Sequence, residues 1–264
     1  MNNILELKKI NFQIEEKNIL EDINFSVKKW EIFNILWHNW SWKTSLLKSI
    51  IWLNQIEKTL EGKWEILFEN NWKFENISEL EIFEKSWKWI SYIMQEIPEY
   101  TWISVKNYVE KILEKSWKIF LDWWKILFED CEIFFDVKKL FLDFWLDFDK
   151  YKERYFDSHL SWWERKKIEI ITNFLMDKDL YLLDEIEASL DATSRDVLIK
   201  LIKKENVKWK TFIIVSHSKD ILELAENWIL LCNWKIQEEW KNNILLKKYF
   251  WECEKCEEKN NCEK

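Results

Sequence analysis

The sequence has almost no glycine or proline: its 264 residues include one of each, Gly62 and Pro98. Soluble proteins average about 7% glycine, the residue that ordinarily fills tight turns and positive-φ positions. The composition also excludes collagen-like and Pro-rich low-complexity chains. A hydrophobic content of 48% and a charged content of 33% exclude disorder, so we expect a globular protein with one sizeable core.

Long apolar runs and a targeting segment are also missing. No stretch of 18 apolar residues occurs, and residues 1–8 lack a basic start followed by an apolar stretch, so we expect neither a secretory signal nor a membrane-spanning helix. The five cysteines are an odd number, and Cys131 and Cys232 stand alone in apolar surroundings, which predicts reduced thiols in the cytoplasm. A net charge of −8 disfavours a general nucleic-acid binder.

Tryptophan is in excess, with 21 residues. Many stand where glycine would make a turn, as in Asn71-Trp72 and the pair Trp162-Trp163. Alanine and arginine, which like glycine have GC-rich codons, are scarce, whereas Lys, Asn, Ile, Phe and Glu abound. We therefore interpret most tryptophans as glycines encoded by UGA and translated conceptually as tryptophan, with one or two genuine. A truly Trp-rich chain is the alternative.

Apolar periodicity predicts strands that alternate with helices. The predicted strands cover residues 4–12, 23–27, 31–36, 88–94, 180–184 and 211–216, the predicted helices cover residues 44–51, 162–175, 192–204 and 219–226, and a helix-rich insert covers 104–150, with a terminal hairpin over 228–237. Alternation of this kind is typical of a parallel sheet covered by helices, an α/β core.

The strongest motif directly follows the predicted strand 31–36. With glycine at Trp37, Trp40 and Trp42, residues 37–44 become the phosphate-binding loop G-x-x-x-x-G-K-[ST]. Glycines let successive N–H groups surround a phosphate, Lys43 would reach the β- and γ-phosphates, and the Thr44 hydroxyl would bind Mg²⁺. The predicted nucleotide-binding residues here are Trp37, His38, Asn39, Trp40, Ser41, Trp42, Lys43, Thr44 and Ser45. Indoles at 40 and 42 would fill the phosphate site.

A second motif is an apolar strand that ends in two carboxylates, Asp184 and Glu185. Ligands of parallel sheets bind at the carboxyl ends of the strands. Asp184 suits the outer shell of Mg²⁺, and Glu185 suits the base that orients the attacking water. A solvated strand end is the alternative, so this prediction depends on the phosphate loop upstream.

Residues 160–164 form the third motif, which becomes L-S-G-G-E at a helix start when Trp162 and Trp163 are glycine. Ser161 and the two amides would form a second anion site. We expect indoles at these positions, as in the first loop, to distort or block the phosphate-binding end. With this motif the sequence resembles the ATP-binding-cassette (ABC) ATPases, whose signature is L-S-G-G-[EQ], over about residues 3–240.

The resemblance implies the fold and its boundaries. An ABC ATPase has an α/β P-loop NTPase core with a mainly parallel sheet, an antiparallel β subdomain and a helical subdomain. We expect one such domain over residues 1–250, with the helical insert at about 96–170, and a charged tail over 251–264.

The resemblance also implies roles for individual residues. Gln95 is similar to the glutamine that senses Mg²⁺ and water, His217 to the histidine that contacts the γ-phosphate, and residues 189–191 to the loop that communicates across a dimer. The implied catalytic residues are Glu185, His217, Gln95 and Lys43, and the implied metal residues are Thr44, Gln95 and Asp184. His38 and His159 are expected to be non-catalytic.

ATP hydrolysis to ADP and phosphate with Mg²⁺ is the implied activity. The resemblance further implies a head-to-tail homodimer in the ATP state, in which each ATP lies between Lys43 of one subunit and Ser161 of the other. Hydrolysis would reopen the dimer and drive a conformational change in partner subunits.

Three branches of function remain open. Ile186-Glu187 stands where transporter subunits commonly have Pro-Thr, and the segments 10–20, 160–170 and 183–191 are similar to the ATPase subunit of the Suf iron-sulfur cluster assembly machinery. We therefore expect Suf-type scaffold subunits as partners. The alternatives are the nucleotide-binding subunit of a membrane transporter, associated with the membrane through spanning subunits that dock near residues 95–150, and a non-hydrolysing regulatory or scaffold cassette.

The tail carries Cys253, Cys256 and Cys262. A C-x₂-C pair with one further thiolate supplies three of the four ligands of a zinc or iron-sulfur site. No fourth ligand is evident in the sequence, so a solvated tail is the expectation and metal binding stays the alternative.

Overall fold

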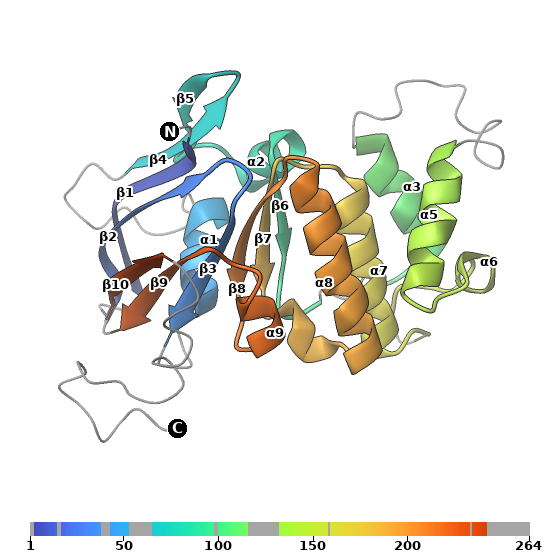
Figure 1. Ribbon diagram of the computed structural model, residues 1–264. Helices are drawn as coiled ribbons and strands as arrows, with labels where there is room; N and C mark the ends of the chain where they lie inside the picture. Colours follow the sequence, from blue (N-terminus) through green and yellow to red (C-terminus); the bar gives the residue numbers. More distant parts are fainter. Residues whose placement is uncertain are drawn as a thin grey trace.

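The structure is a computed structural model with two sheets and a helical region (Figure 1). It describes residues 3–14, 17–37, 43–52, 65–97, 100–115, 132–157, 159–232 and 234–241. Residues 38–42 of the predicted phosphate loop 37–44 lie outside the described residues, as does the cysteine tail 251–264.

The larger sheet has six strands in the order β10-β9-β3-β8-β7-β6. The strands are β3 (Ile32–Trp37), β6 (Ile90–Ile93), β7 (Leu180–Asp184), β8 (Thr211–Val215), β9 (Asn227–Cys232) and β10 (Lys235–Lys241). Strands β3, β6, β7, β8 and β9 pair in parallel, and β10 is antiparallel to β9. Every residue of β7 and β8 is buried, as their continuous apolar sequence predicts.

The smaller sheet is antiparallel, with the order β2-β1-β4-β5. Its strands are β1 (Asn3–Ile14), β2 (Lys17–Lys28), β4 (Glu65–Asn70) and β5 (Lys73–Asn76). The β1-β2 pair was predicted, whereas the β4-β5 hairpin was not. Its turn is Asn71-Trp72, and both residues have positive φ, 50° and 68°. A two-residue hairpin turn of this kind favours Asn-Gly. A turn was expected here, but the strands beside it were not, because all four residues of β5 are exposed.

Helices cover both faces of the larger sheet. The described helices are α1 (Lys43–Trp52), α2 (Ile82–Lys88), α3 (Val105–Lys115), α5 (Glu132–Asp143), α6 (Phe148–Tyr151), α7 (Trp162–Leu175), α8 (Ala192–Val207) and α9 (Lys219–Leu222), with the short 3₁₀ helix η2 (Ile186–Ser189). In Figure 1, α3, α5 and α6 stand apart from the sheets, beyond α7. The helix predicted for 219–226 is a single turn that ends at Leu222.

Strand β7 shows how the core divides into two layers. Tyr181 and Leu183 belong to an apolar cluster with α7 and α8, whereas Leu180 and Leu182 belong to a second cluster with α1 and the antiparallel sheet. Successive side chains of a strand point to opposite faces, so the sheet separates the two clusters. The mixed α/β fold that the sequence predicts is therefore confirmed. Within the described part of the chain, no helix has the length and apolar character needed to span a bilayer.

Candidate functional site

The candidate site lies where four parallel strands end at the same edge of the larger sheet. Helix α1 follows β3, Gln95 follows β6, Asp184 and Glu185 end β7, and His217 follows β8. Parallel pairing of these strands brings the segments together although they are far apart in the sequence.

Glu185 stands between Gln95 and His217. Gln95 Nε2 donates a hydrogen bond to Glu185 Oε2 over 2.9 Å, and His217 Nε2 lies 3.6 Å from Glu185 Oε1. The backbone of Glu185 is left-handed, with φ of 45°, and its N–H donates to the Val215 carbonyl over 2.9 Å. A left-handed non-glycine residue is strained, and such residues cluster at functional sites. The structure thus brings the three predicted residues together around one carboxylate.

Asp184 is completely buried behind Glu185. The Tyr92 hydroxyl donates to Asp184 Oδ2 over 3.0 Å. Burial raises the pKa of Asp184, and hydrogen bonding from the hydroxyls of Thr44 and Tyr92 and the nearby charge of Lys48 oppose that shift. Asp184 Oδ1 makes no hydrogen bond of normal geometry within the described part of the chain, although the Thr44 hydroxyl acts on this carboxylate.

The Thr44 hydroxyl and the Asp184 carboxylate are oxygen groups of the kind that binds Mg²⁺. A small hard cation takes hydroxyl, carboxylate and water oxygens and usually keeps several waters. Thr44 at the start of α1 and Asp184 at the end of β7 supply such oxygens, and the incompletely bonded Oδ1 of Asp184 is the atom that a cation or its water would satisfy. Among the described residues no group of three or more His, Cys, Asp or Glu side chains could hold a metal ion.

The predicted second anion site is the N-terminus of α7. Ser161 is the N-cap: its hydroxyl accepts from the Glu164 N–H over 3.3 Å, and Glu164 Oε2 accepts from the Ser161 N–H over 2.7 Å. Trp162 and Trp163 occupy the first two helical positions and are 38% and 49% exposed. The capping geometry is regular, so the distortion expected from the indoles is not observed at this helix end, and blocking of the anion site stays a prediction.

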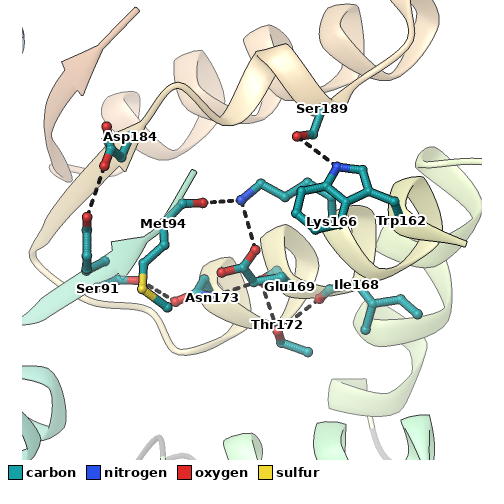
Figure 2. A network of polar contacts seen from close by, with 11 residues as sticks. Ser91, Met94, Trp162, Lys166, Ile168, Glu169, Thr172, Asn173, Asp184 and Ser189 are labelled. Atoms are coloured by element: carbon teal, nitrogen blue, oxygen red, sulfur yellow. Dashed lines mark hydrogen bonds and ion pairs between the residues drawn. The ribbon is translucent and has the colours of Figure 1, made fainter. Parts of the chain in front are cut away.

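The indoles instead add bulk beside Ser161. The Trp162 Nε1–H donates to the Ser189 hydroxyl over 3.1 Å and so contacts the segment predicted to communicate across a dimer (Figure 2). With glycine at this position that contact could not form.

Other predicted residues are placed as follows. The backbones of Trp37 and Lys43 flank the phosphate loop, at the end of β3 and the start of α1, and Ser45 lies in the first turn of α1. His38, Asn39, Trp40, Ser41 and Trp42 lie outside the described residues. His159, expected to be non-catalytic, hydrogen-bonds to Asp157 over 2.6 Å through Nδ1.

Two neighbours of the site were not predicted. Tyr92, which contacts Asp184, lies on β6 beside Leu182 of β7, so its role needed the strand register. Glu187 is buried and accepts a hydrogen bond from the Ser216 hydroxyl, next to His217. This contact joins the segment after Glu185 to the end of β8. Its only sequence signal was the replacement of Pro-Thr by Ile186-Glu187.

The comparisons with known proteins point to one group. No family model matches the chain. An uncharacterized ABC transporter ATP-binding protein of Methanocaldococcus jannaschii is 32% identical over 114 residues, which are 43% of this chain and 46% of that protein. A second such protein of this organism is 27% identical over 247 residues, 92% of this chain and 87% of that protein.

An energy-coupling factor transporter ATP-binding protein of Staphylococcus saprophyticus is 34% identical over 103 residues. That match covers 38% of this chain and 35% of the relative. The chain thus spans less than half the length of some relatives that it matches and most of the length of another.

Solved structures share the fold over nearly the whole chain. The ATP binding subunit of an ABC transporter superposes with a TM-score of 0.74 at 17% identity, over 94% of this chain and 93% of that one. A dimeric bacterial ABC transporter cassette gives a TM-score of 0.71 at 16% identity, over 90% and 98%. The fold is therefore that of an ATP-binding cassette.

Proposed function

We propose that this chain is the ATP-hydrolysing, nucleotide-binding subunit of an ABC membrane transporter. The observation that carries the proposal is the Glu185 carboxylate at the end of β7, which is held between Gln95 and His217 and directly follows Asp184. ATP hydrolysis needs a carboxylate that orients water in line with the γ-phosphate, next to a site for Mg²⁺.

Each residue then has a defined task. Glu185 orients and polarises the attacking water, with Gln95 as a second hydrogen-bonding partner, and His217 contacts the γ-phosphate. Lys43 and the backbone of residues 37–42 would bind the phosphates, and Thr44 and Asp184 would hold Mg²⁺. When bound, the metal ion neutralises charge on the phosphates. The leaving group is ADP, and the water becomes part of inorganic phosphate.

The second subunit completes the site in this proposal. Ser161 is exposed at the N-terminus of α7, where a helix end favours an anion. One similar cassette was solved as a dimer, and also in a post-hydrolysis state bound to ADP and phosphate. We propose the same arrangement here, with the γ-phosphate of one subunit facing Ser161 of the other.

We also propose that most tryptophans are glycine in the natural protein. Of the eleven non-glycine residues with positive φ among those described, six are tryptophan: Trp30, Trp72, Trp102, Trp145, Trp209 and Trp234. A left-handed backbone costs a residue with a Cβ about 1–2 kcal/mol, and glycine is its default occupant.

The ends of α5 and α8 support this decoding with detailed geometry. After α5 the Trp145 N–H bonds to the Leu142 carbonyl, and the Leu146 N–H to the Phe141 carbonyl, over 2.9 and 2.8 Å. This pattern is the Schellman motif, in which the left-handed residue is usually glycine. Trp209 occupies the same position after α8, with φ of 71°.

The transporter assignment takes precedence over the Suf-type expectation. The named relatives are transporter ATP-binding proteins, some of them of the energy-coupling factor type. The feature that favoured a Suf-type subunit, Ile186-Glu187, has a local structural explanation, because Glu187 accepts a hydrogen bond from Ser216. We propose membrane-spanning subunits as partners, one cassette domain over residues 1–250, and a solvated tail over 251–264.

The activity is tested by comparing three proteins. The chain made with glycine at positions 37, 40, 42, 162 and 163 should bind ATP and hydrolyse it with Mg²⁺. Glu185→Gln in that background should reduce the hydrolysis rate about 100-fold or more and leave ATP binding intact, because it removes a group that acts in the transition state. The chain with tryptophan at all five positions should not bind ATP. A glycine-containing chain that binds no ATP would contradict the proposal, and equal hydrolysis by Glu185→Gln would remove Glu185 from it.

Tests of the glycine decoding and of the partner subunits require protein isolated from the native organism. Mass spectrometry of native peptides that cover positions 102, 145 and 209 should find glycine; tryptophan there would contradict the decoding. Purification of the native protein from detergent-solubilised membranes should recover subunits with predicted spanning helices. Recovery of soluble scaffold subunits instead would favour the Suf-type alternative.

A further inference from the structure

Two oppositely charged residues of α7 hold the backbone next to Gln95. The ammonium group of Lys166 donates to the Met94 carbonyl and lies 2.9 Å from Glu169 Oε2 (Figure 2). Lys166 thus links the backbone of Met94 to Glu169, and we name this pair of side chains the Lys166-Glu169 clamp.

The clamp is buried inside the protein. Lys166 is 0% exposed and Glu169 is 5% exposed. Burial raises the pKa of Glu169, and the charge of Lys166 and the Met94 N–H act in the opposite direction. Removing two charges from water is costly, and apolar pairs of similar volume often stabilise a protein as well or better. Elsewhere on α7 the buried side chains include apolar ones such as Ile168 and Ile171, so burial of this helix does not by itself require a charged pair here.

The clamp lies between two parts of the candidate site. Met94 follows β6 and directly precedes Gln95, whose side chain donates to Glu185. Helix α7 begins at Trp162 with Ser161 as its N-cap, little more than one helical turn before Lys166. A movement of α7 would therefore be carried to the backbone of Met94 and from there to Gln95.

We propose that Lys166 and Glu169 are positioning residues that set Gln95 against Glu185 and couple its place to the Ser161 end of α7. The inference rests on the proposed ATPase function, in which Gln95 helps Glu185 to orient water. The clamp acts on the rate of hydrolysis through Gln95. Within the described part of the chain, its side chains make no hydrogen bond or ion pair with a residue assigned to ATP binding in the same subunit.

The test compares a double variant with a matched control, both in the glycine-containing chain. Lys166→Met/Glu169→Met removes both charges together, because removal of one partner would leave the other buried and uncompensated. The control is Ser91→Ala. The Ser91 hydroxyl donates to Asn173 Oδ1 over 2.7 Å and so also joins β6 to α7, but three residues before Met94.

Two measurements are made on each protein. Hydrogen exchange of the amides of Met94 and Gln95, without nucleotide, reports whether the clamp holds this backbone. Steady-state hydrolysis together with ATP binding separates kcat from nucleotide affinity. In the double variant we expect exchange to accelerate at least about tenfold and kcat to fall about tenfold, since a displacement of about 1 Å in a positioning group can cost up to about 100-fold in rate. The Kd for ATP should change less than about twofold. Ser91→Ala should leave exchange at Met94 and kcat within about twofold of the parent.

The outcomes separate this inference from the proposed function. Unchanged exchange in the double variant would overturn the clamp, whether or not the parent hydrolyses ATP. Faster exchange with unchanged kcat, or an equal loss of kcat in Ser91→Ala, would overturn its positioning role. A parent chain that does not hydrolyse ATP would contradict the proposed function, and exchange at Met94 and Gln95 would then decide on the clamp alone.

Discussion

Tryptophan occupies two opposite environments in this molecule. In turns, Trp102 and Trp145 are 86% and 72% exposed and have φ of 72° and 61°. In β9, Trp228 is 3% exposed, belongs to the apolar cluster with α7 and α8, and donates its indole N–H to the Ala225 carbonyl over 3.1 Å.

The two environments differ in whether the indole has the contacts that it ordinarily makes in a protein. A buried indole contributes a large apolar surface and finds a partner for its N–H, as Trp228 does. An exposed indole on a left-handed backbone contributes neither and adds strain. We therefore expect glycine at the turn positions and a genuine tryptophan at 228.

The largest effect is expected from removing the buried indole. Trp228→Gly should lower the free energy of unfolding by about 3–5 kcal/mol, because it leaves a cavity in the core and loosens a strand. Urea denaturation measures the change. Trp228→Phe, which keeps most of the apolar volume, should lose less. If Trp228→Gly cost under about 1 kcal/mol, the distinction between turn and core tryptophans would fail.

Substitutions in the turns should act in the opposite direction. Trp102→Gly and Trp145→Gly should each raise the free energy of unfolding by about 1 kcal/mol, because glycine relieves the left-handed strain. Asn71→Gly is the matched control: its φ is 50°, but asparagine tolerates this conformation, so its gain should be smaller. A loss of stability at both tryptophan positions would mean that the indoles support the fold.

A helix end built without glycine should show an ordinary capping energy. Asp191 is the N-cap of α8: it accepts from the Ser194 N–H over 2.8 Å and pairs with Lys167 at 3.0 Å. Asp191→Ala should cost about 1 kcal/mol at pH 7, and Asp191→Asn less.

The contribution of Asp191 should also depend on pH. The Ser194 N–H lowers the pKa of Asp191 to about 2. A depressed carboxylate pKa stabilises the folded state above the ordinary value of 3.8, and this stability is lost as pH falls through about 2. The stability difference between the parent and Asp191→Ala should thus shrink below pH 4; a constant difference would contradict the assignment.

A second prediction about pH concerns another buried polar group, Lys85. Like Trp228 it donates to a carbonyl near a helix end, Ile50 of α1, over 3.2 Å. Burial lowers the pKa of Lys85 to about 8 from 10.5. Between these values the unfolded chain binds more protons, so the free energy of unfolding should rise with pH in this window. Lys85→Met should lack that rise in urea titrations from pH 7.5 to 9.5, and parallel curves for both proteins would contradict the shift.

Elements with strong local patterns could be predicted. Helix α7 and strand β7 have the predicted bounds, because a capping serine and a continuous apolar run mark them within a few residues. The hairpin β4-β5 was missed although a turn was expected at Asn71-Trp72, because β5 has only four residues, all of them exposed, and so lacks the buried face that marks a strand. Helix α9 is shorter than predicted, since Asn227 already begins β9.

Some residues of the candidate site could also be predicted from the sequence, and others could not. Asp184 and Glu185 were visible as carboxylates after an apolar strand, and Gln95 and His217 through a family resemblance. The roles of Tyr92 and of the Lys166-Glu169 clamp could not be predicted. Their partners, Asp184 and Met94, lie 72 or more residues away in the sequence, and a contact over that separation leaves no periodic pattern.

Short-range patterns in the chain were therefore enough to identify the alternation of strands and helices, the helix caps and the chemical groups that end each strand. Turn chemistry and apolar periodicity act over a few residues, so they can be read without knowing the fold. Only the packed molecule decided that Gln95 and His217 meet at Glu185 and that α7 holds Met94. Those contacts depend on the order and register of parallel strands, which long-range burial selects.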